Sequence, residues 1–151
     1  MKRIFFILVA LFVCIYGFAQ TPNDIFTEFC QAKKASFVNV PGYMIKLTHL
    51  NTAKYRADSL KVLNLGNCSR RVIKRFSKMT AHLNASGYTP IAAKNDKKYY
   101  KSQVWLRQKD GAISSILLLR VGKHIGDLIQ IDGNLDPNSV SSVIDEDYDS
   151  L

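Results

Sequence analysis

The dipeptide Asp110-Gly111 constrains the fold of this chain more than any other stretch, because β-rich residues flank it on both sides. Asp-Gly is a strong signal for a two-residue type I′ hairpin turn, whose two central residues both need positive φ. The stretch from Tyr99 to Asp132 is therefore predicted to form an antiparallel hairpin followed by a third short strand. The helices and shorter strands of the remaining chain should cover this sheet.

A two-residue turn would fix the register of the hairpin, with Lys109 opposite Ala112. One face would then be apolar, with Val104 opposite Leu117, and should pack against the helices. The other face would carry a mixed set of apolar and basic side chains: Trp105, Ile116, Leu118, Lys101, Arg107 and Arg120. A three-residue turn would shift the register by one residue and change every pair.

This mixed face is the first of two candidate binding surfaces. Lys101 would lie opposite Arg120, and facing like charges destabilise a sheet unless solvent, an anion or the acidic tail compensates. The strand at 113–121 is apolar on both faces in either register, so it is predicted to be central. A neighbouring segment could cover Trp105 and Ile116, since large exposed apolar patches are rare on monomers. The alternative is that Trp105 anchors a partner or ligand.

Residues 1–19 have the pattern of a secretory signal peptide: two basic residues, an apolar run at 4–15, and small residues before a cleavage site after Ala19. The apolar run is too short for a membrane span. An uncleaved anchor is the alternative interpretation. We expect an exported protein, periplasmic or extracellular, that begins at Gln20 and has no further membrane-spanning segment.

Residues 20–144 are predicted to form a single α+β domain, with an acidic tail at 145–151. Its mainly antiparallel sheet should pack against helices on one face. Before the hairpin we expect these elements: a helix at 21–34, a strand at 36–40, a helix or strand at 43–50, a loop at 51–58, a strand at 60–65, a helix at 67–87 and a strand at 88–93. A last helix or extended piece follows at 139–144.

Two local motifs sharpen these predictions. Thr21 and Asp24 form a capping-box pattern at the start of the first helix, and Pro90 predicts that the strand at 88–93 is an edge strand or contains a bulge.

The helix at 67–87 carries the second candidate binding surface. Apolar side chains recur on one side at helical spacing, and Gly87 suits the position just past the last turn. The other side is basic and contains no acidic residue to pair with it. The candidate binding residues on this side are Arg71, Lys74 and Lys78.

The net charge of +9 is unevenly distributed. Four acidic residues crowd the acidic tail, whereas none lies between Asp58 and Asp96. Such a field favours polyanions or anionic surfaces. Since an exported protein rarely meets nucleic acid, the expected partner is a protein or an anionic envelope component, and no nucleic acid.

No catalytic, metal-binding or cofactor motif accompanies these surfaces. The sequence contains no HExxH, GxSxG, P-loop or GxGxxG pattern, and His49, His82 and His124 lack the spacing of metal ligands. We therefore predict no catalytic residues, no metal and no cofactor. Cys30 and Cys68 could form a disulfide in an oxidising compartment, or they could be two small buried apolar residues.

The stretch from "LNASGY" to "YYKSQVWLRQKDGAISSILLL", with Phe-Ala-Gln at the predicted signal junction, resembles small exported Bacteroidetes proteins that are grouped as domains of unknown function. The resemblance covers most of residues 20–144. It implies an α+β sandwich and an envelope location, and it supplies no catalytic residues. The leading hypothesis is a non-enzymatic envelope protein that binds a partner. The alternative is a small ligand-binding protein or enzyme with a pocket between sheet and helices.

Overall fold

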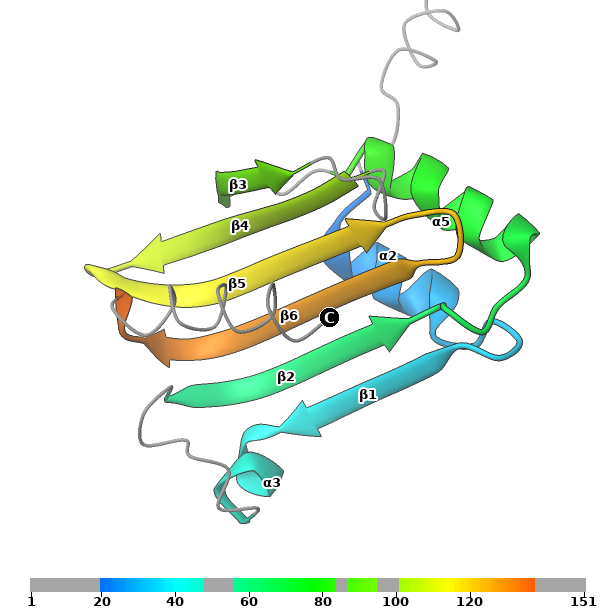
Figure 1. The fold of residues 1–151 in the computed structure, drawn as a ribbon. Helices are drawn as coiled ribbons and strands as arrows, with labels where there is room; N and C mark the ends of the chain where they lie inside the picture. The colour runs from blue at the N-terminus through cyan, green and yellow to red at the C-terminus, as the bar shows by residue number, and fades with distance from the viewer. Residues whose placement is uncertain (1–19, 48–55, 84–86, 95–100, 138–151) are drawn as a thin grey trace, which may run out of the picture.

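The computed structural model describes residues 20–47, 56–83, 87–94 and 101–137, whose strands form one antiparallel sheet (Figure 1). The order across the sheet is β1-β2-β6-β5-β4-β3. The strands are β1 Ser36–Pro41, β2 Ala57–Asn64, β3 Thr89–Lys94, β4 Lys101–Lys109, β5 Ala112–Val121 and β6 Gly126–Leu135. The helices are α2 Pro22–Phe29, α3 Gly42–Leu47 and α5 Arg70–Ala81. The predicted α+β class with a mainly antiparallel sheet is confirmed.

Several predicted features lie outside the described residues, namely the signal peptide at 1–19, His49, the piece at 139–144 and the acidic tail at 145–151. The ambiguous segment at 43–50 is helical as far as it is described, because it contains most of α3. Pro90 lies in β3, which is an edge strand with a register shift next to that proline, as predicted.

Two predicted helices are shorter in the structure. The first ends at Phe29 rather than at residue 34, with Cys30 as its C-cap. Helix α5 starts only after Ser69, because a turn closed by the Cys68 N–H and the Leu65 carbonyl precedes it. It ends well before Gly87, so the predicted capping role of that glycine is wrong, although its φ of 79° is positive.

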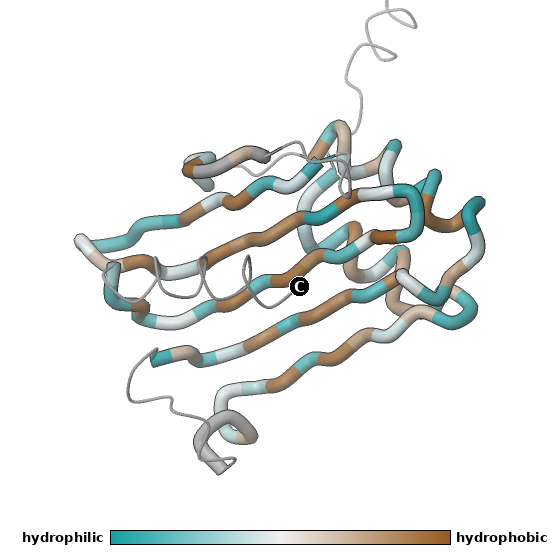
Figure 2. The backbone as a smooth tube through the Cα atoms, viewed as in Figure 1, coloured by the Kyte–Doolittle hydropathy of each residue, from teal (hydrophilic) through white to brown (hydrophobic). Residues whose placement is uncertain are grey.

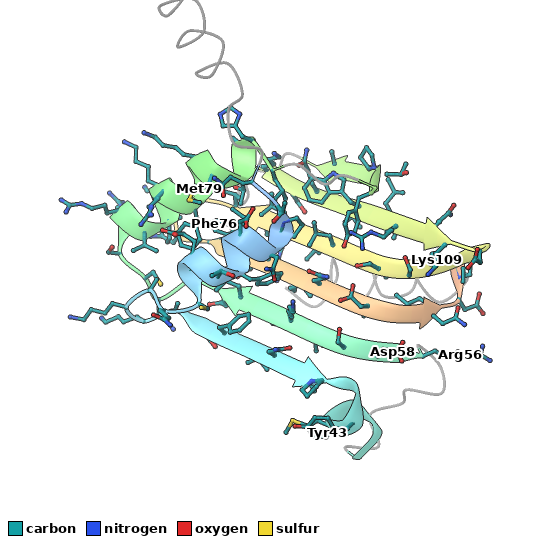
Figure 3. The ribbon with its side chains drawn as sticks, turned by 180° about the vertical axis from the view of Figure 1, so that it is seen from behind. Tyr43, Arg56, Asp58, Phe76, Met79 and Lys109 are labelled. Atoms are coloured by element: carbon teal, nitrogen blue, oxygen red, sulfur yellow. The ribbon has the colours of Figure 1, made fainter. Side chains whose placement is uncertain are left out.

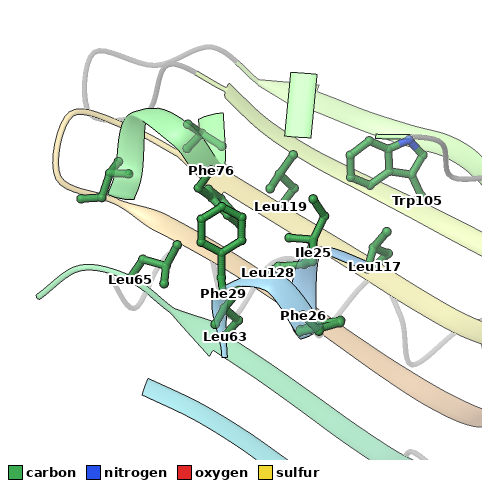
Figure 4. Packing of buried hydrophobic residues seen from close by; sticks show 12 residues of the cluster. Ile25, Phe26, Phe29, Leu63, Leu65, Phe76, Trp105, Leu117, Leu119 and Leu128 are labelled. Carbon is green, nitrogen blue, oxygen red and sulfur yellow. The ribbon is translucent and has the colours of Figure 1, made fainter. Parts of the chain in front are cut away.

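The apolar core forms one cluster on each face of the sheet. On what we call the helix-side face, Leu117 and Leu119 of β5 pack with Phe29 of α2 and Phe76 of α5 (Figures 3 and 4). The opposite face carries a second cluster: Val104, Ile113, Ile116, Leu118 and Leu135. Successive side chains of a strand alternate between faces, so β5 is buried on both sides. Its predicted central position is confirmed.

The predicted two-residue turn is confirmed, but the register of the hairpin is not the expected one. Asp110 and Gly111 have φ values of 52° and 78°, as a type I′ turn requires. Lys109 faces Ala112 as expected. A bulge then shifts the register by one residue, because Arg107 faces Ser115.

Because of this bulge, Trp105 and Ile116 do not lie on the same face of the sheet, contrary to the prediction. Trp105 faces Leu117 on the helix-side face, whereas Ile116 belongs to the cluster on the opposite face. The predicted opposition of Lys101 and Arg120 is wrong, since Lys101 faces Val121 and Arg120 faces Ser102. The apolar pattern of β5 could not reveal the shift, because both faces of this strand are apolar.

A capping box closes the N-terminus of α2, as predicted. The Asp24 N–H donates to the Thr21 hydroxyl oxygen (3.2 Å), and the Thr21 N–H donates to the Asp24 carboxylate (2.9 Å). The Thr21 hydroxyl also donates to this carboxylate (2.7 Å). The hydrogen bonds from the Thr21 side chain and backbone favour the charged form, and they lower the pKa of Asp24 below its ordinary value of 3.8.

We expect this cap to make stability depend on pH in the acidic range. Because the folded-state pKa of Asp24 is depressed, its contribution is present above pH 3.8 and is lost as the pH falls through the lower folded-state value. Wild type should therefore be more stable than Asp24→Ala at neutral pH, and the difference should shrink below pH 3.8. Thermal unfolding across pH checks this, with the exposed Asp58→Ala as the control. A difference that is constant with pH would contradict it.

Candidate functional site

Helix α5 presents its basic side chains to solvent because its other side is held in the core. Ile73 and Phe76 are 4% and 0% exposed. The Phe76 ring meets the Phe29 ring edge-on, with centroids 5.4 Å apart. Thr80 is also buried, and its hydroxyl donates to the Phe76 carbonyl (2.8 Å), so this polar group is satisfied. These contacts fix the rotation of α5 about its axis.

The solvent side of α5 is a continuous basic surface. Its five members, which we call the α5 basic surface, recur at spacings of three and four residues and are all exposed: Arg70, Arg71, Lys74, Arg75 and Lys78. The first turn holds no acidic residue, so Arg70 and Arg71 add to the partial positive charge of the helix N-terminus. Figure 2 shows the outer turns of α5 in teal.

One member of the α5 basic surface has an internal partner. Arg75 forms an ion pair with Glu28 of α2, and its guanidinium carbon lies 5.9 Å from the Phe29 ring centroid. The pair is solvent-exposed, so it contributes little to stability. Arg71, Lys74 and Lys78, the three predicted binding residues, have no ion-pair partner among the described residues. Within the described ranges, no acidic side chain competes with an external anion for these three charges.

The other predicted binding surface is not assembled. Trp105 is only 9% exposed and belongs to the core cluster of the helix-side face. Ile116 and Leu118 lie on the opposite face, with 5% and 9% exposure. The predicted anchor and its apolar neighbours are thus separated by the thickness of the sheet.

The basic members of that predicted surface separate as well. Arg107 stacks on Tyr88, with its guanidinium carbon 4.3 Å from the ring centroid. Lys101 is half-buried on β4, and burial lowers its pKa. Arg120 lies 3.2 Å from the carboxylate of Asp127 on the neighbouring strand. An ion pair across β5 and β6 thus takes the place of the predicted repulsion.

A polar cluster on the helix-side face was missed by sequence reasoning. Its centre is the carboxylate of Asp132, which accepts hydrogen bonds from the hydroxyls of Ser115 (2.6 Å) and Ser59 (3.2 Å) and from the Gln130 amide (3.0 and 2.9 Å). Because the single hydroxyl proton of Ser115 goes to Asp132, the Tyr88 phenol donates to Ser115 (2.8 Å). We call these five residues the Asp132 cluster.

The Asp132 cluster lies where three strand pairings lose their regular register. The shifts occur next to Ser59 in β2–β6, next to Ser115 in β5–β6 and next to Arg107 in β4–β5. Bulges often adjoin functional sites. However, Ser115 is 1% exposed and its proton is committed to Asp132, which does not suit a nucleophile. The cluster is better suited to holding the three strands β2, β5 and β6 in register. The alternation of Gln130 and Asp132 was its one signal in the sequence.

The space between the sheet and the helices, where the alternative hypothesis placed a pocket, is filled by apolar side chains (Figure 4). Cys30 and Cys68 are free thiols in the structure, and their disulfide stays a prediction. Burial raises the pKa of the Cys68 thiol.

Within the described ranges, His, Cys, Asp and Glu side chains form no group of three or more that could hold a metal ion. No helix in those ranges has the length and apolar character needed to cross a membrane.

The geometry defines an α+β protein with one six-stranded antiparallel sheet and a basic helix on its surface. Residues 29–143 match the family described as Domain of unknown function (DUF4252), and the chain belongs to that family. No curated protein and no solved structure matches the chain. The family match confirms the resemblance to a domain-of-unknown-function family. The Bacteroidetes origin and the export stay predictions.

Proposed function

We propose that this chain is an exported, non-enzymatic binding module that attaches to an anionic envelope component through the α5 basic surface. The observation that carries the proposal is the exposure of Arg71, Lys74 and Lys78 on one helix side, with no ion-pair partner among the described residues. Nearby basic side chains each contribute about 1 kcal/mol to attraction by an anionic surface. The signal-peptide pattern at 1–19 supports a location where such surfaces occur.

The rigid attachment of α5 also supports the proposal. A basic helix that could rotate or detach would lose conformational entropy on binding, whereas the core contacts of Phe76 and Ile73 already fix α5. The shared chemistry of the ligand is a dense array of phosphate or carboxylate groups, as on an anionic lipid surface or an acidic polysaccharide. Neutral surfaces carry no such array of anionic groups.

Charge reversal on α5 is expected to abolish this attachment. We expect the purified protein to co-sediment with phosphatidylglycerol-rich vesicles, or to bind an acidic polysaccharide, and not to bind phosphatidylcholine vesicles. In Arg71→Glu/Lys74→Glu the affinity should fall by about thirtyfold or more, because two contributions of about 1 kcal/mol are lost. Glutamate is favourable in the early turns of a helix, so the fold should be retained.

The matched control is Arg56→Glu/Lys109→Glu. Both residues are exposed and lie at the end of the sheet away from α5 (Figure 3), and the change in net charge is the same. This variant should bind nearly as well as wild type. Equal weakening by the two double variants would show that only net charge matters and would overturn the proposal. Failure of wild type to bind either anionic material would do the same.

A further inference from the structure

The two edges of the sheet differ in how they are protected against pairing with another strand. Edge strand β3 contains Pro90, which has no N–H to donate, and a register shift follows it. Edge strand β1 pairs with β2 from Ser36 to Pro41 without any shift. From Ser36 to Val40 it contains no charge, no proline and no bulge, the usual devices that block edge pairing. Among the described residues β1 pairs only with β2, so no described strand occupies its outer backbone donors and acceptors.

Exposed apolar side chains gather at the β1 edge. Five large hydrophobic residues are exposed among the described residues, and four of them lie on β1 or on the following α3: Phe37 36%, Val38 47%, Tyr43 67% and Met44 44%. The fifth, Ile91, lies on β3 at the far edge. Such a local concentration, next to an open strand edge, is typical of a surface that is covered in an assembly.

We propose that two copies of this chain pair through their β1 strands, antiparallel and about a twofold axis, so that their six-stranded sheets form one continuous sheet. With the axis at Val38, this residue meets Val38 of the second copy, Phe37 meets Asn39, and Ser36 meets Val40. All facing pairs are neutral. A shift of the axis by one residue in either direction would bring Lys34 or Pro41 into the pairing.

The choice of a second copy as the occupant follows from this self-complementarity. A twofold interface needs a surface that fits itself, and the strand from Ser36 to Val40 offers apolar residues on both sides of its own centre. The chain is strongly basic, with a net charge of +9, so two copies repel each other over most of their surfaces. The strand from Ser36 to Val40 adds no charge of its own to that repulsion. This inference is independent of the α5 basic surface.

Sedimentation equilibrium of the purified protein tests the pairing. Wild type should show a concentration-dependent dimer. Val38→Lys should weaken dimerisation by about tenfold or more, because it places two ammonium groups opposite each other. The matched control is Ile91→Lys, since Ile91 is 46% exposed, against 47% for Val38, on the opposite edge. It should dimerise as wild type does.

Cross-linking tests the register. Under mild oxidation Val38→Cys should give a disulfide-linked dimer, because facing residues lie within the Cα separation that a disulfide needs. Asn39→Cys should give much less, since Asn39 faces Phe37 of the second copy. Wild type controls for the two native thiols. A monomer at all concentrations would overturn the inference, and so would equal weakening by Val38→Lys and Ile91→Lys. Preferential cross-linking of Asn39→Cys would reject the register.

Discussion

Replacing Asp132 with alanine is expected to lower the free energy of unfolding by about 3 kcal/mol. Its carboxylate accepts hydrogen bonds from Ser59 of β2, Ser115 of β5 and Gln130 of β6. Alanine would remove the acceptor that these three donors share. The loss is largest at Ser115, because this residue is 1% exposed and is the least accessible to water of the three donors.

Denaturant unfolding measures this effect. Trp105 is the one tryptophan in the chain and is buried in the core, so its fluorescence reports on the fold. The control is Asp58→Ala, which removes the same charge from an exposed position one residue from Ser59 and should cost less than about 0.5 kcal/mol. Asp132→Asn should be intermediate, since it keeps one oxygen acceptor. Equal stabilities of the two alanine variants would show that the Asp132 cluster does not hold the strands.

Phe76→Ala is expected to be more damaging still, with a loss of about 4 kcal/mol. The side chain is fully buried between α2 and the sheet, where it contacts the Phe29 ring. A Cβ built at Gly126 would lie 3.1 Å from a ring carbon of Phe76, so the ring fills the space above that glycine. Truncation would leave a cavity that β5 and β6, which are paired on both edges, cannot close.

The same unfolding assay checks this prediction. Ile91→Ala is the control, because it also truncates a large apolar side chain but at a position that is 46% exposed. It should cost far less. If Phe76→Ala lowered the free energy of unfolding no more than Ile91→Ala does, α5 would not pack against the sheet as described. The rigid presentation of the α5 basic surface, on which the proposed function depends, would then also be in doubt.

Local patterns predicted those features whose cause lies within a few residues. The helical spacing of Ile73, Phe76 and Met79 against the basic side of α5 indicated which side faces solvent. Thr21 and Asp24 are three residues apart, and their capping box formed as expected. The turn at Asp110-Gly111 needed only the positive φ values that these two residues accept.

The candidate site was only half predictable. Arg71, Lys74 and Lys78 were identified because a helix side can be read from spacing alone. The prediction of the Trp105 surface was wrong because β5 contains one extra residue at the bulge before Ser115. This residue changes which side chains of β4 and β5 lie on the same face. No local signal marks such a bulge when both faces of the strand are apolar.

The sequence by itself determined the α+β class, the central position of β5, the hairpin turn and the exposed side of α5, because each of these follows from the short-range preferences of neighbouring residues. Only the tertiary structure decided which side chains share a face and which charges are paired. Asp132 meets Ser115 across 17 residues and Ser59 across 73. Contacts of that separation depend on strand order and register, and those are set by the packing of the whole sheet against its helices.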